Sequence, residues 1–126
     1  MPTTRERERL QAPTSTSETS TTALDLAEGI GLYAHIPFCQ TRCPYCDFNT
    51  SAGLTSLIPP YVRALAREIR TWGAVLDRPP VNTVFLGGGT PSLLTPGQLR
   101  TLLEAARSAF RVTADAEVTA EANPDD

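Results

Sequence analysis

The chain has 126 residues, a formal net charge of −3 and a hydrophobic content of 40%, which suffices for one small domain with a modest core. No apolar run approaches the ~20 residues of a membrane-spanning helix, and residues 1–20 lack the composition of a signal or transit peptide. Every basic residue is an Arg scattered among acids, so we expect no nucleic-acid partner. The absence of a secretory pattern favours a reducing, cytoplasmic compartment.

The N-terminal part of the chain has the composition of an unfolded segment. Residues 1–28 are rich in Thr, Ser and Glu and contain few large apolar side chains. Such a segment buries too little surface to offset the entropy that it would lose on ordering. We therefore predict a disordered tail over 1–28 and a folded domain over 29–126.

Three segments of that domain have strand patterns. Residues 32–36 form a short apolar segment with strand-like composition, residues 81–86 are predicted to form a buried strand, and residues 117–121 alternate as a third strand. The residues Asn123 and Pro124 end this third strand.

Two helices are predicted between the strands. Pro59 and Pro60 open the first, and Thr95, Pro96 and Gln98 open the second with a capping box. Apolar residues recur at helical spacing in both. The predicted buried faces are Val62, Leu65, Ile69, Trp72 and Leu76 in the first helix, and Leu99, Leu102, Leu103, Ala106 and Phe110 in the second.

The alternation of strands and helices predicts an α/β fold with parallel strands joined by right-handed crossovers. Three strands are too few to close a barrel. The sequence after the third strand also looks like the start of another loop. We therefore expect this chain to be the first part of a longer α/β protein.

Three cysteines lie within eight residues, as Cys39, Cys43 and Cys46 in a C-x3-C-x2-C pattern. An odd, crowded set is a poor disulfide framework and indicates metal binding instead. The spacing alone leaves two sites open, an iron–sulfur cluster or a zinc site with His35 as fourth ligand. Three ordinary buried thiols are disfavoured, because the residues between the first two cysteines are polar. On a [4Fe–4S] cluster, three cysteines would leave one iron open for a small molecule.

A glycine-rich loop, GGGTPS at residues 87–92, follows the second strand and precedes a helix. It matches neither the Walker A nor the G-x-G-x-x-G pattern, so a ligand site and a tight turn are both open at this point. Glu121 lies at the carboxyl end of the third strand, where parallel α/β sheets bind ligands; the alternative interpretation of Glu121 by itself is a solvated loop residue. The cysteine loop, the glycine loop and Glu121 each follow or end a predicted strand, so we expect all three at the carboxyl edge of the parallel sheet. Their convergence there favours a binding site.

Four motifs in order resemble the oxygen-independent coproporphyrinogen III oxidase family of radical S-adenosylmethionine (SAM) proteins. They are YAHIPFC at 33–39, CPYCDFN at 43–49, FLGGGTPS at 85–92 and EANP at 121–124. The resemblance covers about 31–124. It implies that the chain forms the first three β/α units of a (β/α)6 partial TIM barrel, an incomplete N-terminal part of the radical SAM core domain.

The resemblance also implies the cofactors. Cys39, Cys43 and Cys46 would bind three irons of a [4Fe–4S] cluster, and SAM would chelate the fourth iron through its amino and carboxylate groups. Reduction of the cluster would then cleave SAM. The implied SAM contacts are Tyr33, Tyr45, Gly88, Gly89, Thr90 and Glu121.

Phe48 separates two branches of the family. The decarboxylating oxidases have a further cysteine two residues after the third one, whereas this chain has Phe48. The sequence CDFN at 46–49 resembles the heme chaperone (HemW-type) branch. That branch binds heme and transfers it to acceptor proteins. The alternative function is oxidation of coproporphyrinogen III to protoporphyrinogen IX.

Overall fold

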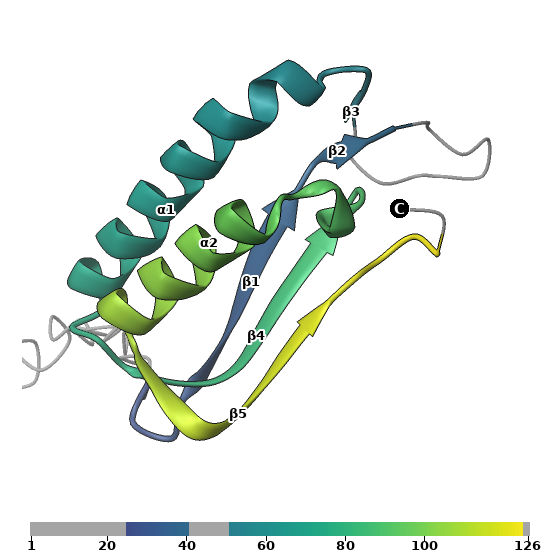
Figure 1. Cartoon of the computed structure of the whole chain (residues 1–126). Helices are drawn as coiled ribbons and strands as arrows, with labels where there is room; N and C mark the ends of the chain where they lie inside the picture. The colour runs from purple at the N-terminus through teal and green to yellow at the C-terminus, as the bar shows by residue number, and fades with distance from the viewer. Residues whose placement is uncertain (1–24, 41–50, 125–126) are drawn as a thin grey trace, which may run out of the picture.

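The computed structural model describes residues 25–40 and 51–124, so most of the predicted tail (1–24) lies outside the described residues. The strands and helices alternate along the chain (Figure 1). In chain order they are β1 (Ile30–Ile36), β2 (Phe38–Cys39), β3 (Ser51–Ala52), η1 (Thr55–Leu57), α1 (Ile58–Val75), β4 (Pro80–Gly88), η2 (Pro91–Leu93), α2 (Pro96–Ala109) and β5 (Arg111–Ala120).

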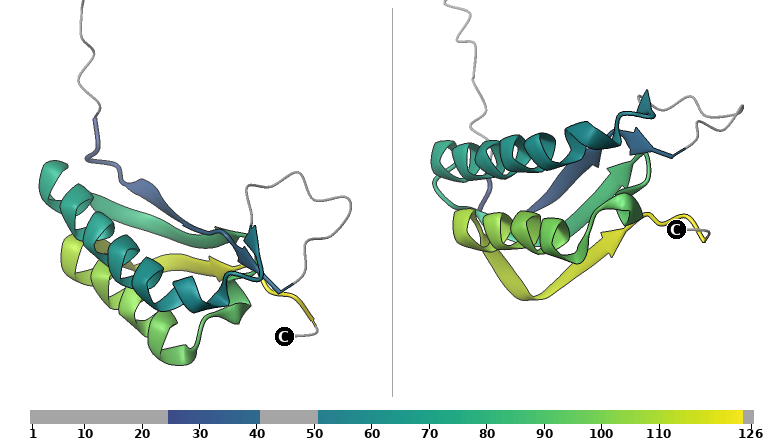
Figure 2. Two further views of the ribbon diagram at one scale, coloured as in Figure 1. Left: turned by 90° about the horizontal axis from the view of Figure 1, so that it is seen from above. Right: turned by 45° about the horizontal axis from the view of Figure 1, so that its top comes forward.

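The main sheet has the order β1-β4-β5, and both strand pairs are parallel. Helices α1 and α2 lie on the same face of this sheet, as two views show (Figures 1 and 2). Within the described residues, no element covers the opposite face. The α/β class and the parallel topology predicted from the sequence are confirmed.

The predicted helix boundaries follow from local chemistry. The backbone amide of Gln98 donates to the Thr95 hydroxyl at 3.2 Å, and the Thr95 amide donates to Gln98 Oε1 at 2.9 Å, which completes the predicted capping box of α2. Helix α1 has Pro in its first turn and ends before Asp77 and Arg78, which both adopt positive φ angles. In the described residues, no helix is long and apolar enough to cross a bilayer.

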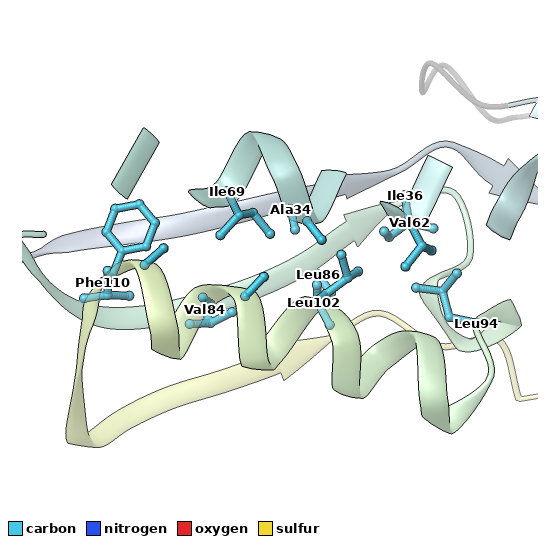
Figure 3. Close-up of a cluster of buried hydrophobic side chains, with 14 of the residues drawn as sticks. Ala34, Ile36, Val62, Ile69, Val84, Leu86, Leu94, Leu102 and Phe110 are labelled. Atoms are coloured by element: carbon cyan, nitrogen blue, oxygen red, sulfur yellow. The ribbon is translucent and has the colours of Figure 1, made fainter. Parts of the chain in front are cut away.

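The hydrophobic core fills the space between the sheet and the two helices (Figure 3). Most of the predicted faces contribute to it, although Leu65, Leu76, Leu99 and Leu103 are only partly buried at its margin. The labelled core residues are Ala34, Ile36, Val62, Ile69, Val84, Leu86, Leu94, Leu102 and Phe110.

The prediction that Trp72 is buried is wrong, because its side chain is 52% exposed. Its neighbour Gly73 is buried instead and faces α2, where a Cβ on Gly73 would lie 2.5 Å from the Ala109 carbonyl oxygen. The helices approach closely at this glycine. The contact rotates Trp72 away from the core, because successive helical residues are separated by about 100°.

Two further features differ from the prediction. Strand β5 begins at Arg111, six residues before the predicted start, and its pairing with β4 contains a register shift between Val81 and Thr83. Because of this irregularity and because β5 is an exposed edge strand, the start of β5 is hard to recognise in the sequence. The short parallel pair β2–β3 was not predicted either, since two-residue strands carry no periodicity.

Candidate cluster and cofactor site at the carboxyl edge of the sheet

The three parallel strands end side by side. Ile36 at the end of β1 pairs with Gly88, and Leu86 of β4 pairs with Ala120 at the end of β5. Beyond the strand ends, the Gly89 amide donates to the Ile36 carbonyl at 2.7 Å, and the Glu121 amide donates to the Leu86 carbonyl at 2.9 Å. Backbone hydrogen bonds therefore join the glycine loop to the end of β1, and Glu121 to β4.

The glycine loop packs directly against β1 and β2. Gly88 has a φ of 113°, and a Cβ there would lie 2.7 Å from the His35 ring. A Cβ on Gly89 would lie 2.4 Å from the Phe38 carbonyl oxygen. A side chain at either position would collide with β1 or β2, so close packing within the chain itself requires both glycines. The tight turn, one of the two alternatives for this loop, is therefore present beside the candidate ligand site.

Glu121 reaches back to the glycine loop. Its Oε2 accepts a hydrogen bond from the Gly88 amide at 3.0 Å, although the residue is exposed. Two residues later, the Asn123 amide donates to the Ser92 hydroxyl at 3.2 Å. These bonds hold a carboxylate beside the loop amides at the edge of the sheet, a position from which it can accept hydrogen bonds from a ligand.

Cys39 lies in β2 with its side chain buried. The Thr90 hydroxyl donates to Cys39 Sγ at 3.5 Å, and the Thr90 amide donates to the Phe38 carbonyl at 2.7 Å. A sulfur that accepts a hydrogen bond suits a cluster thiolate, because hydrogen bonds to the sulfurs tune iron–sulfur clusters. The Cys39 side of the site therefore fits the implied [4Fe–4S] group.

The other predicted ligands, Cys43 and Cys46, and the predicted SAM contact Tyr45 lie outside the described residues, as does Phe48. Over 25–40 and 51–124, no three His, Cys, Asp or Glu side chains gather as a metal site. The placement of the complete cysteine set therefore remains a prediction from the sequence.

Tyr33 lies on the sheet face opposite the helices, since it alternates along β1 with buried Ala34. Its ring stacks on Phe85 of β4 at a centroid distance of 5.8 Å and an interplanar angle of 17°. Its hydroxyl lies 3.0 Å from Nδ1 of His35. Phe85 and His35 thus hold the predicted SAM contact Tyr33 in place, and Tyr33 is still 56% exposed.

Tyr61, which no sequence motif singled out, joins α1 to the end of β1. Its hydroxyl donates to the His35 carbonyl at 2.6 Å, and its ring packs edge-to-face against Phe38 at 5.2 Å. Burial raises the pKa of Tyr61, and the nearby Glu68 and Tyr33 raise it further. The hydroxyl therefore stays protonated as this donor. The only sequence signal was its position next to Val62, at the border of the buried helix face.

A parallel α/β sheet with Cys39, a glycine loop and a carboxylate at its carboxyl edge has the arrangement in which α/β proteins commonly bind ligands. The Radical SAM superfamily model matches residues 33–126. The chain belongs to the radical SAM superfamily, as its motifs predicted.

Two relatives and one solved structure show which radical SAM proteins this chain resembles. The chain is 51% identical over 98 residues to the "Heme chaperone HemW" of Mycobacterium tuberculosis and 45% identical over 97 residues to that of Escherichia coli, each match covering 75% of this chain. A solved structure of Escherichia coli coproporphyrinogen III oxidase (HemN), described as a radical SAM enzyme, is similar with a TM-score of 0.70 and 34% identity. That match covers 75% of this chain and 22% of the solved one.

This chain spans about a quarter of the length of the two heme chaperones, because the matches cover 25% of each. The fold is accordingly a part of the HemN-like radical SAM fold, in agreement with the partial barrel that the resemblance implied.

Proposed function

We propose that this chain is the N-terminal part of a radical SAM core that binds a [4Fe–4S] cluster and SAM and that serves as a heme chaperone. The observation that supports this most directly is the joining of Cys39, the glycine loop and Glu121 at one edge of the sheet. The proposed folded domain is 29–126, and the proposed compartment is the cytoplasm.

The proposed roles follow from the chemistry of each residue. Cys39, Cys43 and Cys46 would hold three irons, and the remaining iron would be open to SAM. Gly88, Gly89 and Thr90 would present backbone and hydroxyl groups, and Glu121 and the two tyrosines, Tyr33 and Tyr45, would orient SAM by polar contacts. A cluster held by these three cysteines would, once reduced, supply the electron for SAM cleavage.

The first test is spectroscopic. We expect anaerobic reconstitution with iron and sulfide to give a cluster that is EPR-active after reduction, and SAM to change its spectrum, because the three-cysteine loop leaves one iron without a protein ligand. The control ligand is 5′-methylthioadenosine, which keeps the adenosyl group but lacks the amino and carboxylate groups that would chelate the open iron. A reduced spectrum that ignores SAM would contradict the open-iron proposal.

The second test separates the two branches. Phe48 supplies an apolar ring that can stack on a planar macrocycle but, unlike cysteine, has no thiol for ligation or hydrogen donation. We therefore expect a heme titration followed by absorbance to saturate. We also expect anaerobic incubation with SAM, a reductant and coproporphyrinogen III to give no protoporphyrinogen IX.

HemN serves as the positive control for that oxidase assay. Formation of protoporphyrinogen IX without heme binding would select the alternative function, an oxygen-independent coproporphyrinogen III oxidase. The proposed partners are SAM, heme and heme-accepting proteins.

A further inference from the structure

His35 lies in β1, on the face of the sheet that the helices leave open. Its Nδ1 lies 3.0 Å from the Tyr33 hydroxyl, and its backbone carbonyl accepts the Tyr61 hydroxyl at 2.6 Å. The backbone of Gly88 leaves no room for a Cβ against the Cε1 and Nδ1 edge of the His35 ring. The ring is therefore held on the edge that faces Tyr33, by contacts from both β1 and β4.

The direction of the Tyr33–His35 hydrogen bond determines what Tyr33 offers to a ligand. A neutral histidine has one donor nitrogen and one acceptor nitrogen, whereas a tyrosine hydroxyl donates once and also accepts. The lone pair of an imidazole nitrogen is far more basic than that of a phenol oxygen, and the phenol O–H is a good donor. The stronger pairing has the Tyr33 hydroxyl as donor, Nδ1 as acceptor and the ring proton on Nε2.

We propose that His35 is a positioning residue that commits the Tyr33 proton to Nδ1 and so leaves the Tyr33 oxygen as an acceptor only. Tyr33 then recognises an N–H or O–H group of its ligand and rejects a carboxylate. In SAM the matching groups are the amino group of the methionyl part, the ribose hydroxyls and the adenine amino group. This inference rests on the proposed SAM site. It adds the direction of the hydrogen bond, in which SAM donates and the Tyr33 oxygen accepts.

The bond direction is measurable without SAM. His35 is the only histidine in the chain, so histidine labelled with ¹⁵N gives the signals of one ring. At mildly alkaline pH we expect the spectrum to show the proton on Nε2. The Tyr33→Phe variant, which keeps the ring that stacks on Phe85, should show a mixture of the two tautomers. A proton on Nδ1 in the unsubstituted chain would overturn the proposal.

Two substitutions of His35 separate the roles of its nitrogens. Asn places an amide atom near the position of Nδ1, whereas Gln places one near Nε2. For the cluster-loaded chain we expect His35→Gln and Tyr33→Phe each to weaken SAM binding roughly threefold to tenfold, the range for one hydrogen bond. His35→Asn should retain most of the affinity. The double variant His35→Gln/Tyr33→Phe should bind SAM no more weakly than either single variant, because both remove the same contact.

The outcomes separate this inference from the proposed function. SAM binding that is equal in His35→Gln and the unsubstituted chain would overturn the positioning role of His35. Failure of the unsubstituted, cluster-loaded chain to bind SAM would overturn the SAM site itself. In that case a proton on Nε2 would still show that Tyr33 donates to Nδ1, but the inference that this bond serves SAM would be overturned together with the site.

Discussion

Replacing Cys39 with Ser is expected to abolish the stable [4Fe–4S] cluster. A serine hydroxyl is a hard, weakly acidic group, whereas iron–sulfur clusters are held by soft thiolates. Only two cysteines would remain in the chain, too few for a site that needs three. Iron and acid-labile sulfide measured after anaerobic reconstitution should fall to a small fraction of the values for the unsubstituted chain.

The matched control is His35→Ala, which tests the zinc alternative. In that site His35 is the fourth ligand, so its loss would remove the metal. We expect the His35→Ala variant to keep its iron and sulfide, because the proposed [4Fe–4S] cluster takes its three protein ligands from cysteine thiolates. Loss of metal in His35→Ala, or full cluster content in Cys39→Ser, would contradict the proposed ligand set.

Replacing Gly89 with Ala is expected to damage both stability and the cluster site. The added Cβ would lie 2.4 Å from the Phe38 carbonyl oxygen and 2.8 Å from its carbonyl carbon, and backbone atoms cannot rotate away as a flexible side chain can. Overpacking of this kind typically costs about 1–3 kcal/mol of folding free energy. Because Phe38 directly precedes Cys39, the displacement also moves a predicted iron ligand. Urea unfolding should show the loss of stability, and iron content should fall with it.

Gly97→Ala provides the control for that substitution. Gly97 lies in the first turn of α2, and the nearest atom to its added Cβ is Thr95 Oγ1 at 3.9 Å, which is ordinary contact. Alanine stabilises a helix by roughly 0.5–1 kcal/mol relative to glycine, so this variant should unfold at an equal or higher urea concentration. If Gly89→Ala were as stable as Gly97→Ala, the close packing of the glycine loop against β2 would be wrong.

Local patterns in the sequence determined much of the fold. The capping box of α2 needs only the residues Thr95 and Gln98, three positions apart, so its chemistry is complete within one turn. The strands at 32–36 and 81–86 were found because both segments are rich in apolar, β-branched and aromatic residues, and the structure contains them within β1 and β4. Strand–helix alternation then predicted the parallel topology, and with it the shared edge of the glycine loop and Glu121.

Only the tertiary structure decided which surfaces those elements use. Trp72 fits the apolar stripe of α1, yet the close helix contact at Gly73 turns it outward. The bond from Tyr61 to the His35 carbonyl and the packing of Gly89 on Phe38 join residues far apart in the chain. Helical or strand periodicity reports the environment of a residue only relative to its own element. Contacts between elements depend on how closely two backbones approach, and that distance is set by the packing of the whole core.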